Sequence, residues 1–126
     1  AIVRRPRGRK LLMWAIAAHP EELSPPLVWE QLRGVPTPGF VPALDALTSY
    51  PIRDRLGQIS CRTLIVWGEQ DRLVPLRDAH EFRRLIGDSR LLVYEDTGHV
   101  PMLERPKRFN RDLLAFLDES RNGEHN

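Results

Sequence analysis

The sequence predicts an α/β protein with two parallel strands and flanking helices. Two continuous apolar runs, residues 63–67 and 91–94, carry most of this prediction. Unbroken apolarity is typical of strands that are covered on both faces, as in a parallel sheet. One helical stripe separates the two runs, and another follows the second run. The order strand, helix, strand, helix indicates a crossover unit with parallel strands.

The two helices of this unit are predicted from the spacing of their apolar residues and from the residues at their ends. The stripe between the strands consists of Ala79, Phe82, Leu85 and Ile86, and Gly87 ends it. The last stripe consists of Phe109, Leu113, Phe116 and Leu117, with Pro106 in the first turn.

The chain before residue 63 is predicted to be helical, with no strand. Short helices are expected over residues 11–18 and 24–32, the second with Ser24 as its N-cap. The spacing of Phe40, Leu44 and Leu47 predicts a third helix with one buried face, which Pro51 ends.

Charge is distributed unevenly along the chain. The 126 residues carry a net charge of +2 and are 41% hydrophobic, as is ordinary for a globular protein. A basic cluster near the amino terminus comprises Arg4, Arg5, Arg7, Arg9 and Lys10. It could meet phosphates or an anionic membrane, but no aromatic residue interleaves with it, which favours a solvated segment before a helix. We therefore predict no nucleic-acid partner. No stretch approaches the length of a membrane span and no signal-peptide cleavage site is evident, so we also predict no membrane partner and a cytoplasmic location.

The chain has one cysteine, Cys61, which excludes an internal disulfide and a zinc site built from thiolates. Cys61 stands just before the first predicted strand, where a small buried residue is expected. The histidines lack the spacing of metal ligands, and no glycine-rich phosphate-binding motif occurs. The sequence therefore predicts no cofactor and no metal.

The candidate catalytic residues follow the two predicted strands. Asp71 lies in the loop over residues 68–75, and His99 lies in the loop over residues 96–101. If the strands are neighbours, both loops lie at one edge of the sheet, where ligands of parallel sheets bind. A carboxylate that accepts the Nδ1 proton of a histidine orients it as a general base. The alternatives are a turn residue with a surface histidine, or Asp96 as the competing acid.

The segments TLIVWGEQDRLVP and RLLVYEDTGHVPMLERPKRFNRDLLAFL resemble the carboxy-terminal part of the α/β-hydrolase fold family. The resemblance covers about residues 40–119. It implies that Asp71 is the catalytic acid, that His99 is the base, and that Glu104 is structural. It also implies a nucleophile on a strand-to-helix elbow, a serine in G-x-S-x-G or an aspartate in the dehalogenase and epoxide-hydrolase branches.

The elbow itself is absent from this sequence, since no serine has its context. The serines in question are Ser24, Ser49, Ser60, Ser89 and Ser120. The expected activity is hydrolysis of an ester or related acyl bond through a Ser-His-Asp triad, with acid and base here but no nucleophile. Two alternatives stay open: an aspartate nucleophile acting on haloalkanes or epoxides, and a non-catalytic binding module on a hydrolase scaffold.

The resemblance also divides the chain. Residues 1–39 are interpreted as the end of a helical cap and residues 40–126 as the carboxy-terminal part of the core. Trp14, Trp29 and Val100 are candidates for lining the pocket of a hydrophobic ester-like substrate. The alternative for the tryptophans is packing of the small helices against each other.

Two short strands cannot cover three amphipathic helices, so the sheet is expected to be incomplete. We expect the missing strands upstream of Ala1, because the chain begins without methionine. The strand over residues 63–67 is then predicted to expose a hydrophobic edge, which is a template for self-association.

Overall fold

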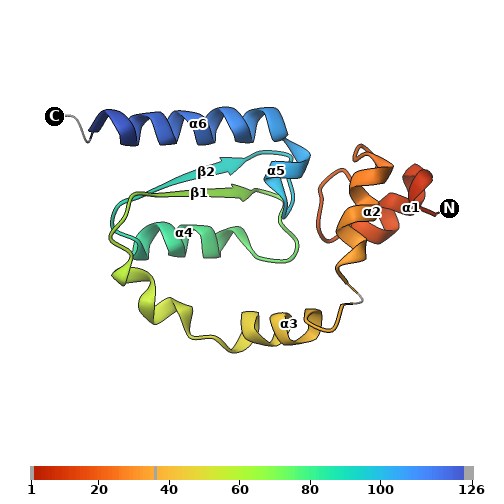
Figure 1. Ribbon diagram of the computed structural model, residues 1–126, viewed down its shortest axis with the longest axis horizontal. Coiled ribbons are helices and arrows are strands. Elements are labelled where there is room, and N and C mark those ends of the chain that lie inside the picture. Colours follow the sequence, from red (N-terminus) through yellow and green to blue (C-terminus); the bar gives the residue numbers. More distant parts are fainter. Residues whose placement is uncertain (1, 36, 124–126) are drawn as a thin grey trace.

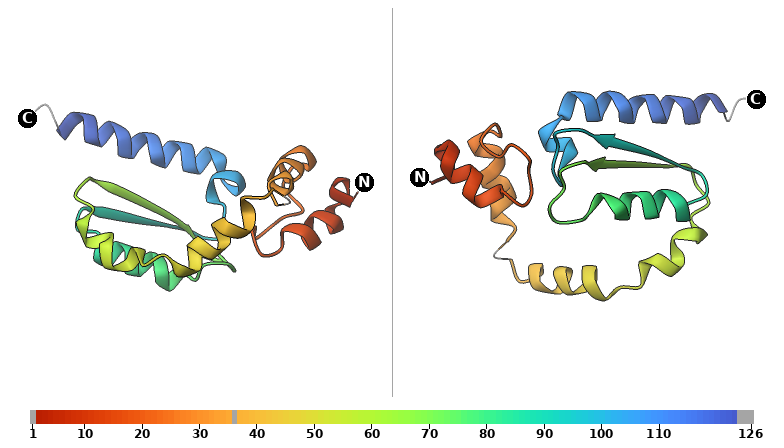
Figure 2. Two further views of the ribbon diagram at one scale, coloured as in Figure 1. Left: turned by 60° about the horizontal axis from the view of Figure 1, so that its bottom comes forward. Right: turned by 180° about the vertical axis from the view of Figure 1, so that it is seen from behind.

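The computed structural model describes residues 2–35 and 37–123, and it confirms the predicted α/β arrangement. The strands β1 (Thr63–Gly68) and β2 (Ser89–Tyr94) are parallel neighbours. The helices α4 (Leu76–Leu85) and α6 (Pro106–Gly123) lie on opposite sides of these strands in Figure 1, and the turned views of Figure 2 agree. The sheet is therefore covered on both faces, as its unbroken apolar strands predict.

The amino-terminal helix begins earlier than predicted. After a short 3₁₀ turn, η1 (Ile2–Arg4), the helix α1 spans Pro6–Met13 rather than residues 11–18. Arg7, Arg9 and Lys10 of the basic cluster thus lie within the helix, and Arg4 and Arg5 precede it. Pro6 in the first turn is a local signal for this start. The helix is held in place by the buried Arg9 guanidinium, which donates hydrogen bonds to the carbonyls of Val3, Arg4 and Glu21.

The next two helices occur where they are predicted, but one of them is not buried. The helix α2 spans Pro25–Arg33, and its N-cap Ser24 accepts a hydrogen bond from the Leu27 amide. The helix α3 spans Phe40–Ser49, yet Leu44 and Leu47 of the predicted stripe are 47% and 80% exposed. The prediction of a buried face is therefore wrong for this chain, because periodicity identifies an apolar face and not the partner that covers it.

Two small cores hold the described residues together. One lies among the amino-terminal helices and consists of Met13, Ala17, Leu23 and Val28. The other joins the 3₁₀ helix η2 (Ile52–Gln58) to the sheet and α4, and consists of Leu56, Ile65 and Ile86. Cys61 belongs to neither core and is exposed, so its predicted burial is wrong. It lies in the bend before β1, and burial within that strand begins only at Ile65.

Tyr94 anchors α6 to the end of β2. Its side chain is fully buried, and its hydroxyl donates a 2.7 Å hydrogen bond to Oδ2 of Asp112. Burial, together with the Asp112 carboxylate, raises the pKa of Tyr94 to about 12. The last helix is thereby positioned relative to the strand whose loop carries His99. Within the described ranges, no helix combines the length and the apolarity that a membrane crossing needs.

Candidate active site

The loops that carry Asp71 and His99 leave the sheet side by side. Beyond the last strand pair, the Glu69 amide donates to the Tyr94 carbonyl, and the Gln70 amide donates to the Thr97 carbonyl, each at 2.9 Å. The parallel pairing therefore continues into both loops. Because the carboxyl ends of parallel strands meet at one edge of a sheet, the two candidate side chains face each other there.

Asp71 is held in one orientation by both of its carboxylate oxygens. Its Oδ1 accepts hydrogen bonds from the amides of Leu73 and Val74, at 2.8 and 2.9 Å. Its Oδ2 lies 2.8 Å from Nδ1 of His99. The Asp71 side chain is 3% exposed, so the contact is shielded from water. The structure thus brings together the two residues that the sequence selects as acid and base.

His99 is buried on the side of Asp71 and open on the other. Its side chain is 37% exposed, and its backbone amide donates a 2.7 Å hydrogen bond to the carbonyl of Ile16. An ionised carboxylate only accepts hydrogen bonds, so Nδ1 carries the proton that joins the pair. Nε2 is then the nitrogen that can take a proton from another group.

Two glycines allow the backbones around the site to approach closely. A Cβ on Gly68 would lie 1.9 Å from the carbonyl oxygen of Gly98. A Cβ on Gly98 would lie 2.7 Å from the amide nitrogen of Ala18. A side chain at Gly68 would therefore push the Asp71 loop away from the His99 loop. A side chain at Gly98 would push the His99 loop away from the amino-terminal segment.

Glu104 and Arg72 tie that amino-terminal segment to the two loops. Glu104, at the end of the short helix α5 (Pro101–Glu104), accepts one hydrogen bond from the Gly98 amide and one from the Ala18 amide, at 2.8 and 2.7 Å. Arg72 donates from Nη1 to the carbonyls of Trp14 and Ala17, at 2.6 and 3.1 Å. These bonds agree with a structural role for Glu104. The role of Arg72 has no signal in the sequence, because its acceptors are backbone atoms far along the chain.

Asp96 makes different contacts from those of a catalytic acid. Its Oδ1 lies 2.5 Å from Nε2 of His19, and its Oδ2 accepts from Arg105 at 3.1 Å. Its backbone has a φ of 52°, a left-handed conformation that aspartate tolerates better than most residues. The hydrogen bond to Asp96 raises the pKa of His19, and the bond to His19 lowers the pKa of Asp96. Asp96 therefore links the amino-terminal segment to the sheet and does not pair with His99.

We expect this linkage to make stability depend on pH. Because the pKa of His19 is raised in the folded state, its contribution is complete below about pH 6.5, the ordinary histidine value, and is lost as pH rises through the higher folded pKa. His19→Gln should therefore lower the urea midpoint below pH 6.5 and have a smaller effect at pH 8.5. His80→Gln, at an exposed helical position, is the matched control. A His19→Gln effect that is equal at all pH values would contradict the linkage.

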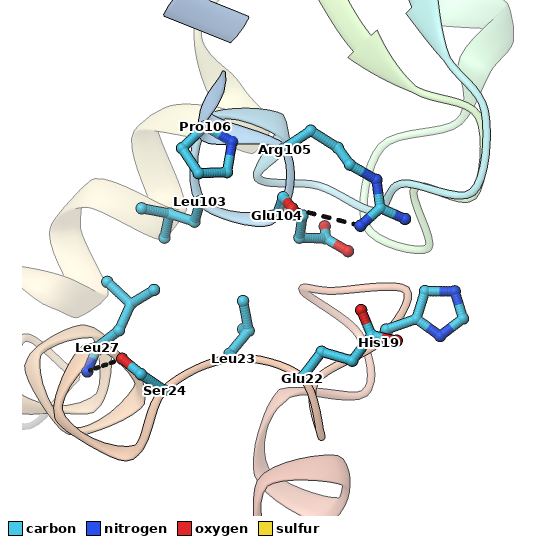
Figure 3. Close-up of a pocket in the computed structure, with 9 residues that line it drawn as sticks. All are labelled: His19, Glu22, Leu23, Ser24, Leu27, Leu103, Glu104, Arg105 and Pro106. Carbon is cyan, nitrogen blue, oxygen red and sulfur yellow. Dashed lines mark hydrogen bonds between the residues drawn. The ribbon is translucent and has the colours of Figure 1, made fainter. Parts of the chain in front are cut away.

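Two open hollows flank the site. One of about 330 Å³ lies between the amino-terminal segment and α5, with Leu23 and Leu27 on one side and Leu103 and Pro106 on the other (Figure 3). The other, of about 530 Å³, is lined by Lys10, Trp14, His19, Gln70, Arg72 and Asp96. Of the predicted pocket residues, only Trp14 lines either hollow. Trp29 is 57% exposed on α2, and Val100 is half-buried beside His99.

Comparison with known families gives one match over most of the chain. A profile of the alpha/beta hydrolase fold matches residues 25–106, which is more than half of the chain. Solved structures agree with it. An esterase from Exiguobacterium antarcticum superposes with a TM-score of 0.76 at 28% identity, covering 90% of this chain and 42% of that one. A membrane phospholipase A superposes with a TM-score of 0.73 at 29% identity, covering 96% and 40%.

Curated relatives are also hydrolases. The 2-hydroxy-6-oxo-6-phenylhexa-2,4-dienoate hydrolase of Comamonas testosteroni is 41% identical over 71 residues, which are 56% of this chain and 25% of that protein. The monoacylglycerol lipase ABHD6 of Rattus norvegicus is 26% identical over 87 residues, which are 69% of this chain and 26% of that protein. The chain thus spans about a quarter of the length of these relatives.

Proposed function

The chain belongs to the α/β hydrolase fold family, and from this premise we propose that Asp71 and His99 are the acid and base of a hydrolase for ester or related acyl bonds. One observation carries the proposal: Oδ2 of the shielded Asp71 lies 2.8 Å from Nδ1 of the half-exposed His99. A buried carboxylate that orients an accessible imidazole is the arrangement that general-base catalysis requires.

In the proposed reaction, Nε2 of His99 accepts the proton of a serine as the serine oxygen bonds to the carbonyl carbon of the substrate. The imidazolium gives this proton to the leaving group, whose bond to the carbon breaks, and an acyl-enzyme remains. The same nitrogen then deprotonates a water molecule, which releases the acid and restores the serine. Asp71 keeps the proton on Nδ1 and stabilises the imidazolium charge throughout.

The serine of this reaction is proposed to come from a segment other than these 126 residues. Besides lacking an elbow sequence, several serines of the chain are bonded to nearby backbone. Ser24 caps α2, and the hydroxyls of Ser49 and Ser89 donate to the carbonyls of Asp45 and Ile86. An aspartate nucleophile acting on haloalkanes or epoxides remains the alternative. The paired Asp71 and His99 favour an enzyme over a binding module.

The identity of the curated relatives favours a second substrate class. Several that are 37–44% identical over 63 to 71 residues are named for 2-hydroxy-6-oxo dienoates or trienoates, in which the 6-oxo group is a ketone and not an ester. We propose that the substrate is a small hydrophobic molecule with a reactive carbonyl, either an ester or a ketone of this kind. Trp14 and Val100 are proposed to border the substrate site. Trp29, on α2, is proposed to contact the substrate only when other segments cover α2.

The remaining sequence-based interpretations are proposals too. We propose that residues 1–39 form the end of a cap, that residues 40–126 form part of the core, and that the protein is cytoplasmic.

β1 has β2 as its one strand partner within the described residues, and we propose self-association through its other edge. A monodisperse monomer in sedimentation velocity would contradict this last proposal.

Hydrolysis of p-nitrophenyl acetate and of a 2-hydroxy-6-oxo dienoate tests the proposed function. We expect no turnover above the buffer rate from the 126-residue chain alone, because it lacks a nucleophile elbow. When the chain is joined to a hydrolase segment that carries a G-x-S-x-G elbow, turnover is expected. Robust turnover by the chain alone, unchanged in His99→Ala, would show that the site lies elsewhere. The ratio of kcat/KM for the two compounds decides between the ester and the ketone.

A further inference from the structure

The solvent-facing side of α1 combines cations with large apolar side chains. Arg7, Lys10, Leu11 and Trp14 are exposed, and they are spaced by three and four residues, so they share one side of the helix. Leu11 is 69% exposed and Trp14 is 59% exposed. Arg4 and Arg5, which precede the helix, are exposed as well. We refer to these six residues as the basic–apolar face.

The opposite side of α1 holds the helix in this orientation. Met13 is fully buried in the amino-terminal core, and Arg9 is buried with its guanidinium on three backbone carbonyls. A Cβ on Gly8 would lie 2.1 Å from the carbonyl oxygen of Ile2, so the helix is pressed closely against η1. The helix cannot turn to bury Leu11 and Trp14 without losing these contacts. Among the described residues, these contacts therefore keep Leu11 and Trp14 exposed.

The charge of the chain around α1 is mainly positive. The first twenty residues contain five arginines and lysines and no aspartate or glutamate. Glu21 and Asp96 lie on the hollow that Lys10 and Trp14 also line, so the cations Arg4, Arg5 and Arg7 carry most of the attraction for anions. Leu11 and Trp14 are stabilised only by leaving water. A nucleic acid supplies phosphates for the cations and bases that stack on Trp14, but it offers no apolar surface to Leu11. An anionic bilayer suits both the cations and the apolar side chains, because its phosphates lie next to its acyl chains.

We propose that the basic–apolar face binds the surface of an anionic phospholipid bilayer, with Trp14 and Leu11 at the level of the headgroups and the cations on lipid phosphates. Tryptophan is favoured at this depth, since its ring is apolar and its N–H is polar. No membrane partner is expected from the sequence, because no stretch has the length of a membrane span and the basic cluster suggests a solvated segment. The helix changes that conclusion by placing Trp14 on the same side as Lys10 and Arg7.

The position of the face suits contact with a flat surface. In Figures 1 and 2, α1 lies at one end of the molecule, away from α3, α4 and α6. The carbonyl of Trp14 accepts the hydrogen bond from Arg72, the residue next to Asp71. A bilayer bound to this face would therefore lie beside the loop that carries Asp71. The binding itself does not depend on the proposed hydrolytic activity.

Co-sedimentation of the 126-residue chain with vesicles tests the proposal. Vesicles of phosphatidylcholine with about one-third phosphatidylglycerol are compared with vesicles of phosphatidylcholine alone, each at low and high salt. We expect binding to the anionic vesicles, weakening with salt, and at least about tenfold weaker binding to the neutral ones. Equal binding to both vesicles would overturn the proposal.

Matched variants distinguish vesicle binding by the basic–apolar face from nonspecific vesicle binding. Trp14→Ala and the double variant Arg7→Glu with Lys10→Glu should each weaken binding to anionic vesicles at least about tenfold. Trp29→Ala removes an equally exposed tryptophan from α2, and Arg77→Glu with Lys107→Glu reverses two exposed cations elsewhere. These controls should bind as the parent chain does. Circular dichroism confirms that each variant is folded, and equal losses in variants and controls would refute the assignment.

Two other occupants of the face give distinct results. Binding to a single-stranded RNA that is lost in the double charge variant, without vesicle binding, would make the face a polyanion site and overturn the proposal. Vesicle binding by the 126-residue chain that disappears when a nucleophile-bearing hydrolase segment is joined to it would show that the face is internal, with the same consequence.

Discussion

His99→Ala is expected to lower the kcat of a nucleophile-bearing form of this protein by about four to six orders of magnitude. The variant removes the nitrogen that accepts the serine proton and returns it to the leaving group, so both chemical steps lose their proton carrier. The measurement is steady-state hydrolysis of the ester and of the dienoate. His80→Ala is the control, because His80 is an exposed histidine of α4.

Asp71→Asn is expected to lower kcat by about 10⁴-fold with little change in fold. An asparagine oxygen can keep the hydrogen bonds from the amides of Leu73 and Val74. Its amide group then faces Nδ1 of His99 and selects the wrong tautomer. Activity within about tenfold of the parent protein in either variant, with His80→Ala also unchanged, would show that Asp71 and His99 are not the acid and base.

Gly68→Ala is expected to destabilise the chain by more than about 3 kcal/mol. The new methyl group would lie 1.9 Å from the carbonyl oxygen of Gly98 and 2.4 Å from that of Thr97. Both obstacles are backbone atoms at the point where β1 and β2 give way to their loops. Relief of the clash must separate these loops, so the contact of Asp71 with His99 is expected to break as well. Urea unfolding measures the loss of stability.

Gly87→Ala is the matched control, since a Cβ at Gly87 has no atom within 4 Å and its φ is not positive. It should leave stability unchanged or raise it by up to about 1 kcal/mol, because alanine restricts the unfolded chain. Similar midpoints for the two variants would mean that the loops at Gly68 yield easily, and that the close approach does not position the site.

The strands and the candidate acid and base could be predicted from sequence because their signals are local. An unbroken apolar run indicates a strand whichever residues cover it, and β1 and β2 form at the two predicted runs. Parallel strands have their carboxyl ends at one edge by topology alone. Asp71 and His99 each follow one of the two runs. Their proximity can therefore be predicted without knowing how the helices pack.

The burial of Arg9 and the exposure of Cys61 and of α3 could not be predicted in this way. Each depends on which surface lies opposite, and a periodic pattern does not name that surface. Arg9 illustrates the point: its place in a basic cluster suggests a solvated side chain, but its guanidinium is buried on three backbone carbonyls. The helix α1 also puts Trp14 beside the cations.

The sequence by itself thus determined the fold class, the two strands with their loops, and the residues that form the Asp71–His99 pair. Only the tertiary structure decided how the amino-terminal segment meets that pair. Glu104 reaches the Ala18 amide across 86 positions of sequence, and Arg72 reaches the Ala17 carbonyl across 55. Such bonds join a side chain to backbone groups that every residue possesses. No residue pattern near the acceptors can therefore predict these hydrogen bonds. They form only when packing brings the two segments together.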